Sequence, residues 1–307
     1  MNVPESTPSE DDGGADSSIA APSPPSTPKG KRGTRVAVGL YGIPLLVIAL
    51  LSLFAPLLPL PGPSAQNLAA RLSPPFWQEG GSLSHPLGTD QLGRDMLSRL
   101  IYGGRLTFLI AGLAMMVGAV FGITVGLVAG YWRGKTDVVL SRLIDAQLAL
   151  PFILLAMAVI VATGRSVLVL VAVLAIVGWA QYARVIRAET LSMRERPFVL
   201  GLRAAGASKP RILIRHILPN VAGTVLVLST LEIGTMILAE SALSFLGLGV
   251  VEPQLSWGGM LAQGRDYLRQ AWWVVALPGI AITVVVICVN LLGDALRAQY
   301  DPRKRTY

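Results

Sequence analysis

Charged side chains are scarce in this chain. They make up 14% of its 307 residues, whereas hydrophobic residues make up 52% and the mean hydropathy is +0.58. A soluble domain carries nearer to about a quarter charged residues, so this deficit predicts an integral membrane protein. The formal charge of +8 does not predict nucleic-acid binding, because the basic residues stand at the ends of apolar runs and form no continuous face.

Residues that carry covalent or metal chemistry are equally few. The single cysteine, Cys288, lies inside an apolar run, which excludes a disulfide framework or a cysteine metal site. His85 and His216 are predicted to lie on opposite sides of the membrane, and His85 precedes a proline in a turn, where a structural role is expected. The chain has no G-x-x-x-x-G-K-[ST], G-x-S-x-G or H-E-x-x-H element. We therefore expect no catalytic site, no metal site and no cofactor in this chain, and an intramembrane hydrolase is excluded for want of a nucleophile–base pair.

Long apolar runs dominate what is present. A span needs about 20 residues, and the first run, 36–60, follows a leader longer than a signal peptide usually has, so we interpret it as a retained anchor. Five further spans are predicted at 106–131, 143–163, 167–182, 221–240 and 272–292. The fold class is thus an all-α polytopic membrane protein with six transmembrane helices. Gly118, Gly122, Gly126 and Gly130 repeat at every fourth position of the second span, a spacing that lets a neighbouring helix approach closely.

The distribution of Lys and Arg predicts the orientation. With the amino terminus inside, only seven of the 26 basic residues fall in outer segments, namely Arg71, Arg94, Arg99, Arg105, Arg165, Arg265 and Arg269. This bias places both termini in the cytoplasm. We divide the chain into a disordered cytoplasmic tail (1–34), a first span with an extracytoplasmic segment (35–104), a membrane core (105–297) with a cytoplasmic loop at 188–219, and a cytoplasmic tail (298–307). The outer segment 243–271 is expected to form a re-entrant or interfacial hairpin, and Trp257, Trp272 and Trp273 are expected at headgroup depth.

A basic interlude, 184–220, separates the fourth and fifth predicted spans. Its apolar residues recur as in two short helices that break at Gly206-Ala207-Ser208 and at Lys209-Pro210. Gly206 permits a backbone conformation that other residues resist, so the two helices can fold as a hairpin. The first helix, about 196–205, can either dock in a groove of a soluble partner or lie on anionic lipid headgroups. The residues alone leave these alternatives open.

Several motifs together resemble the C-type permease of dipeptide and oligopeptide ABC importers. In that family's coupling segment, an EAA triplet comes first, and three residues and then a glycine follow it. Nine further residues separate this glycine from a short apolar-Pro element. Here Gly206 is followed by nine residues and then by His216-Ile217-Leu218-Pro219, while Leu200-Gly201-Leu202 replaces the triplet and lacks its acidic contact. The resemblance covers about 36–307 and includes HPLGTDQLGRDMLSRLIYGGR from His85, AGYWRGKTDVVLSRLIDAQLALP from Ala129, ESALSFLGLGV with SWGGML from Glu240, and Asp301-Pro302-Arg303.

This resemblance implies a type I importer fold in a bacterial cell membrane. It implies four kinds of partner: a homologous B-type permease, two cytoplasmic ABC ATPase subunits that bind ATP and Mg, an extracytoplasmic substrate-binding protein, and membrane lipid. It also implies that the interlude contacts the ATPase. The expected coupling residues are Phe198, Leu200, Leu202, Arg203, Ala205, Gly206, Ala207, Ser208, Arg211, His216 and Pro219.

Ionisable residues inside a membrane usually mark function. Glu232 and Glu240 lie eight residues apart on the fifth predicted span and are candidates for lining a translocation path, where a carboxylate suits a peptide's amino terminus. Alternatively, Glu240 braces the following hairpin and Glu232 pairs with an arginine. Asp294 is expected to pair with a basic residue of the interlude.

Two alternatives to a peptide permease stay open. One is an ABC permease for nickel, glutathione or another small solute. The other is an ion-coupled carrier, which needs an internal repeat and paired embedded ionisable residues.

Overall fold

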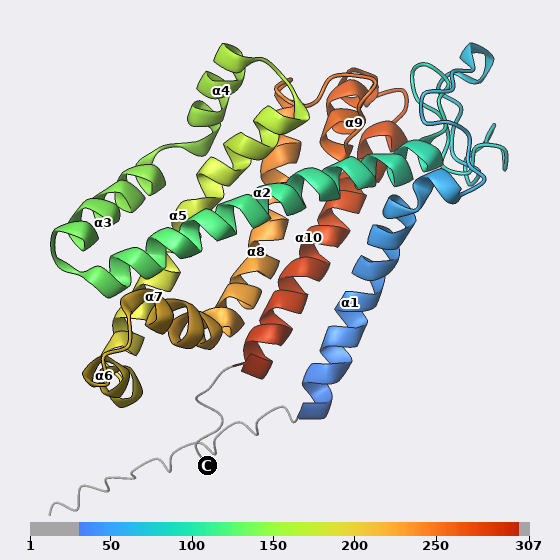
Figure 1. Ribbon diagram of the computed structural model, residues 1–307. Coiled ribbons are helices and arrows are strands. Elements are labelled where there is room, and N and C mark those ends of the chain that lie inside the picture. Colours follow the sequence, from blue (N-terminus) through green and yellow to red (C-terminus); the bar gives the residue numbers. More distant parts are fainter. Residues whose placement is uncertain (1–30, 301–307) are drawn as a thin grey trace, which may run out of the picture.

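The regular structure of the described chain is helical. The computed structural model describes the backbone of residues 31–300 and the side chains of residues 38–298, and within these its only β-structure is an isolated bridge between Thr89 and Asp95. The long helices are α1 (Lys31–Leu53), α2 (Met96–Trp132), α3 (Gly134–Ala149), α4 (Phe152–Thr163), α5 (Val167–Arg194), α8 (Leu218–Phe245) and α10 (Trp273–Tyr300). Shorter helices are α6 (Pro197–Ala204), α7 (Lys209–Ile212) and α9 (Trp257–Gly264). Figure 1 shows the long helices side by side, with α6 and α7 at one end and α9 at the other.

Four uninterrupted helices are long and apolar enough to cross a membrane: α2, α5, the run from α7 through α8, and α10. Helices α3 and α4 are bent by 88° where Leu150 and Pro151 separate them, so they form either one broken span, which would be the fifth, or a re-entrant loop. In α1 the described apolar stretch, Val38–Leu53, is shorter than a typical span. The chain is therefore a multi-pass membrane protein, and the count of six spans stays a prediction.

Helix boundaries differ from the sequence-based expectation because polar residues continue the helices. The second span begins at Met96, ten residues early, where the Asp95 side chain accepts a hydrogen bond from the Ser98 amide at 2.8 Å and caps the helix. Helix α5 continues twelve residues past 182 to Arg194. The expected boundaries at 104/105 and 188 thus fall inside helices. Residues 31–34 are helical, contrary to the predicted disorder, and most of both expected tails lies outside the described residues.

The glycine stripe of α2 packs against α5, as predicted. A Cβ atom on Gly122 would lie 2.2 Å from the carbonyl oxygen of Trp179, and one on Gly126 would lie 2.8 Å from that of Ala183. Helix backbones approach this closely only where side chains are missing. In the described residues α2 and α5 share more contacts than any other pair of helices. The close packing of α2 on α5 therefore depends on glycine at these positions.

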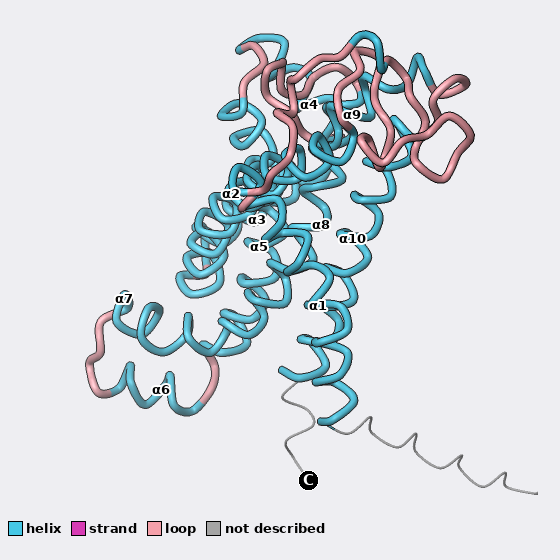
Figure 2. Tube along the Cα trace, turned by 90° about the vertical axis from the view of Figure 1, so that its right-hand side faces the viewer, coloured by secondary structure: helices cyan, strands magenta, loops and turns pink. Residues whose placement is uncertain are grey.

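The end of the molecule opposite α6 and α7 is closed by loops and α9, which gather at the top of Figure 2. Trp257 is 1% exposed, and its indole nitrogen donates to the Leu100 carbonyl oxygen at 2.7 Å. Trp273 is also buried and donates to the Thr89 carbonyl oxygen at 3.1 Å. Of the three tryptophans expected at headgroup depth, only Trp272 is exposed. Trp257 and Trp273 therefore face the protein interior, where their indole nitrogens donate to carbonyl groups, and the headgroup depth of the three side chains stays a prediction.

A buried ionic network fastens the outer segment before α2 to the hairpin that carries α9. Arg94 contacts Asp90 at 2.6 Å and Glu252 at 2.7 Å, and Arg99 contacts Asp90 at 3.3 Å. Gln263 of α9 accepts from Arg99 at 2.7 Å. His85 contributes to the same region, because its Nδ1 lies 3.0 Å from Asp95 Oδ2. Its role here is structural, and no group of three metal-binding side chains occurs among the residues described.

Candidate functional site

The basic interlude folds as a helical hairpin, which we call the coupling hairpin (α6, Gly206, α7 and the turn that follows). Gly206 has φ +76° and ends α6, and beside it the Ala207 amide donates to the Leu202 carbonyl at 3.0 Å and the Gly206 amide to that of Arg203 at 3.1 Å. These two bonds form a Schellman motif, for which a left-handed glycine is best suited. The predicted helix–glycine–helix geometry is thus present, with α6 bounded by Pro197 and Ala204.

The turn that ends the coupling hairpin is distorted and joins α7 to α8. Residues Leu213–Ile217 form a π-helical turn between α7 and α8. Pro219 follows, and in a regular α-helix its ring would clash with the carbonyl group four residues earlier, that of Arg215. The wider π-helical turn, which includes Arg215, leaves room for this carbonyl group. Helix α7 is therefore continuous with the membrane-spanning helix α8.

A small apolar core attaches the coupling hairpin to the membrane helices. Val199 of α6 and Ile212 of α7 are fully buried and share this core with Tyr131 of α2 and Ile186 of α5. Leu202 and Ala207 pack against the same cluster. Of the expected docking residues, these two therefore face the chain's own core. Val199, which the sequence pattern did not single out, is fully buried in the same core.

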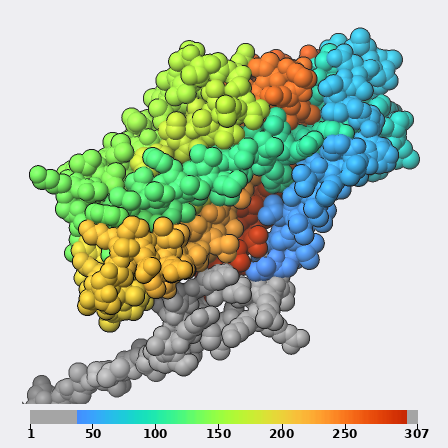
Figure 3. Space-filling view, viewed as in Figure 1, coloured from blue at the N-terminus to red at the C-terminus, as the bar shows by residue number. Residues whose placement is uncertain are grey.

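The opposite face of the coupling hairpin is apolar, basic and open. Phe198 is 42% exposed, Leu200 45% and Ile214 64%. Around them the following expected residues are exposed or half-buried: Arg203, Ala205, Ser208, Arg211, His216 and Pro219. Figure 3 shows this segment, coloured yellow to orange, at the end of the molecule remote from the cyan outer segment. An exposed apolar patch with a basic rim is typical of a docking surface.

Ion pairs hold the inner ends of the helices in place beside the coupling hairpin. Arg187 of α5 binds Asp137 of α3 through two hydrogen bonds of 2.6 and 3.0 Å. Arg194 lies over the Tyr131 ring at 5.8 Å, and Lys209 lies at the same distance from the Trp132 ring. Asp294 is exposed and pairs with no residue of the interlude, contrary to expectation. The contacts of Arg187 and Arg194 tie α5 to α2 and α3.

A cavity of about 520 Å³ lies between α3, α4, α5 and α8. Its polar lining residues are Gln147, Gln181, Glu232 and Thr235, and its walls are otherwise apolar. Glu240 does not line it and is fully buried, with Oε1 accepting from Ser244 at 2.7 Å and from Ser256 at 2.8 Å. These contacts join the end of α8 to the start of α9, so they fit the bracing alternative for Glu240. The structure separates the two carboxyl groups that the sequence pattern placed together.

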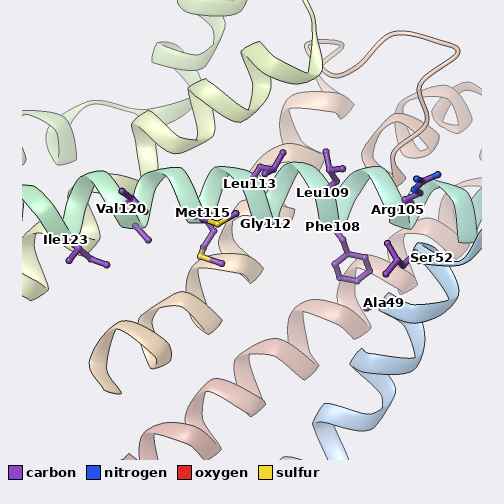
Figure 4. A pocket seen from close by; sticks show the side chains of 13 residues that line it. Ala49, Ser52, Arg105, Phe108, Leu109, Gly112, Leu113, Met115, Val120 and Ile123 are labelled. Atoms are coloured by element: carbon purple, nitrogen blue, oxygen red, sulfur yellow. The ribbon is translucent and has the colours of Figure 1, made fainter. Parts of the chain in front are cut away.

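A second cavity lies between α1 and α2 and is almost wholly apolar (Figure 4). It measures about 660 Å³ and extends along α2 from Arg105 to Ile123, with Ala49 and Ser52 of α1 opposite. Its lining offers few polar groups to bind a polar solute. The cavity beside Glu232 is therefore the better candidate for handling a polar solute.

Comparison with known proteins places the chain among transport permeases. Residues 122–306 match the family model "Binding-protein-dependent transport system inner membrane component". The chain belongs to this family, and it is a multi-pass inner-membrane component.

Curated relatives agree over most of their length. The di/tripeptide transport system permease protein DppC of Pseudomonas aeruginosa is 42% identical over 84% of this chain and 86% of its own. The dipeptide transport system permease protein DppC of Escherichia coli K12 is 39% identical over 89% and 90%. Among solved structures, a chain of the inward-facing MetNI methionine ABC transporter superposes with a TM-score of 0.54 at 20% identity, over 66% of this chain and 97% of that one. This last likeness confirms the fold of an ABC-importer permease.

Proposed function

We propose that this chain is a permease subunit of an ATP-driven peptide importer. It forms half of a translocation pathway with a homologous B-type permease. Two cytoplasmic ATPase subunits bind ATP and Mg, and an extracytoplasmic binding protein delivers the peptide. The support comes from the family, from relatives named as dipeptide permeases, and from the sequence, which has no phosphate-binding loop.

The observation that carries this proposal is the coupling hairpin. One face is buried on α2 and α5, and the other exposes Phe198, Leu200 and Ile214 within a basic rim. Such a face can lie in a groove of an ATPase subunit, and the continuous α7–α8 connection passes its movement to a membrane helix. Both termini and the coupling hairpin are assigned to the cytoplasmic side, in accord with the position of α6, α7 and the inner ends of α1 and α10 at one end of the molecule in Figure 1.

Replacing Gly206 by valine tests this coupling role. At φ +76° a side chain costs about 1–2 kcal/mol, and a β-branched one more, so the turn between α6 and α7 is expected to distort. We expect Gly206→Val to release the ATPase subunits from the purified complex or to reduce dipeptide uptake per ATP hydrolysed. In this assay, neither an added cofactor nor an ion gradient should support dipeptide uptake when ATP is absent.

Gly164→Val is the matched control. Gly164 has φ +89° and, like Gly206, has no atom within 4 Å of the position that a Cβ would occupy, but it lies between α4 and α5, far from the coupling hairpin. Gly164 has ψ 172°, a region that is essentially restricted to glycine, so this control introduces at least as much backbone strain, and it should keep ATPase copurification and uptake. Unchanged values for both measurements in Gly206→Val would mean that this hairpin does not couple. An equal loss in both variants would show a general folding defect.

A further inference from the structure

The cavity between α3, α4, α5 and α8 contains an acidic group without a partner. Glu232 is only 8% exposed, and no hydrogen bond or ion pair in the described part of the chain involves its carboxyl group. Its Oε2 lies beside α5, 3.9 Å from where a Cβ of Gly178 would stand. The expected arginine partner is thus not found among residues 38–298. A buried polar group of this kind is costly unless something binds it.

The surroundings of Glu232 show that its lack of a partner is specific. Tyr182 of α5 donates its hydroxyl hydrogen to Ser229 at 3.1 Å and not to Glu232. Two turns further along the same helix, Glu240 accepts bonds from two serines. Two serines thus bind Oε1 of Glu240, although its buried Oε2 has no partner in the described residues, whereas Glu232 accepts no bond and lines a cavity.

The cavity has the size and chemistry of a small-ligand site. Its volume of about 520 Å³ falls in the range of about 300–1,000 Å³ that small-molecule pockets occupy. Gln147 of α3 and Gln181 of α5 supply amide groups, and Phe152, Leu174 and Met236 supply apolar walls. An amide both donates and accepts hydrogen bonds, as does a peptide backbone, and an ammonium group donates three.

We propose that this cavity binds a peptide in transit, with Glu232 as the partner of its α-ammonium group. Gln147 and Gln181 hydrogen-bond the peptide's amide groups, and the apolar walls accept side chains of different shapes. The site is charged at one point only, which suits a pathway that must release its cargo. This inference rests on the proposed function, because it takes a peptide as the solute.

Protection of an introduced cysteine tests the site directly. Thr235 lines the cavity and is exposed, and Cys288 is the only native cysteine, so Thr235→Cys in a Cys288→Ser background places one thiol of this chain at the site. The assembled transporter, without binding protein or ATP, is treated with N-ethylmaleimide. Modification of this chain is followed by mass spectrometry in the presence of Ala-Ala, N-acetyl-Ala-Ala or ethylammonium.

We expect Ala-Ala to slow modification at a concentration about tenfold lower than N-acetyl-Ala-Ala requires, because acetylation removes one charge-assisted hydrogen bond. Glu232→Gln should abolish this difference, while Glu79→Gln, which changes a carboxyl in the outer segment, should preserve it. Equal protection by both peptides, protection by neither, or a preference that survives Glu232→Gln would overturn the proposal.

Two measurements, one on the wild-type complex and one on Glu232→Asp, cover the case in which Glu232→Gln fails to assemble. A carbodiimide joins a carboxyl group to an adjacent amine without a spacer. If Glu232 of the wild-type complex cross-links to a lysine of the second permease, or if Glu232→Asp assembles but shows no preference for Ala-Ala, the cavity is a subunit contact and the proposal is wrong.

The inference and the proposed function fail in different ways. If the wild-type complex with its binding protein takes up no dipeptide, the peptide-import function is wrong. Protection by ethylammonium that depends on Glu232 would then still establish a cation site. If dipeptide uptake is normal but the Thr235→Cys thiol shows no ammonium-dependent protection, only the inference is lost.

Discussion

Adding a single methyl group to Gly122 should destabilise the molecule at its central helix pair. The new Cβ would stand 2.2 Å from the Trp179 carbonyl oxygen and 2.7 Å from the Cβ of Tyr182, whereas ordinary contact begins at 3.4 Å. Helices α2 and α5 would have to separate locally by about 1 Å, the difference between these distances and ordinary contact. The nearest obstacle is backbone, which cannot rotate away as a long side chain can. Overpacking of this kind costs about 1–3 kcal/mol.

Gly112→Ala is the control on the same helix. No atom lies within 4 Å of a Cβ at Gly112, and alanine is favoured over glycine in a helix by up to about 1 kcal/mol. The two variants make the same chemical change in α2 and differ only in what the methyl group meets. Gly112→Ala should therefore be as stable as wild type or slightly more so.

Thermal aggregation of the purified complex measures the difference. At about 2–4 °C per kcal/mol, Gly122→Ala should lower the temperature at which half of the complex stays in solution by about 2–12 °C. A Gly122→Ala complex as stable as wild type would refute the close approach of α2 and α5. An equal loss in Gly112→Ala would show that α2 tolerates no substitution, whatever its neighbours.

Three further outcomes are expected. Glu240→Ala should leave the Ser244 and Ser256 hydroxyls without an acceptor, at a cost of about 1–3 kcal/mol, and so increase limited proteolysis in the loop 246–256; an unchanged cleavage rate would contradict the bracing role. The chain purified by itself should hydrolyse no ATP, since it has no phosphate-binding loop; steady ATPase activity that copurifies with it alone would remove the basis of the proposed function. Deletion of residues 1–28, whose composition cannot bury a core, should leave assembly intact when copurification of the partners is measured; loss of the complex would reveal a partner for this segment.

The local sequence pattern was sufficient for features that depend on near neighbours in the chain. Apolar runs of membrane length predicted the multi-pass class, and the glycine repeat predicted the close packing of α2 against a partner helix. Gly206 predicted the break between α6 and α7, because a left-handed residue at a helix end favours glycine whatever surrounds it. The motifs from His85 onward predicted the transport family that the comparisons confirm.

Only the tertiary structure decided which residues face inward. The apolar rhythm of α6 could not separate Leu202, which packs on the chain's own core, from Phe198 and Leu200, which stay open, because that choice depends on where α2 and α5 lie. Likewise, Glu232 and Glu240 lie eight residues apart and share a helix face in sequence. In the structure Oε1 of Glu240 accepts bonds from Ser244, one turn along α8, and from Ser256, which precedes α9, while Glu232 lines a cavity. Trp257 and Trp273 are buried for the same reason. Their partners come from segments more than a hundred residues away, which no local pattern contains.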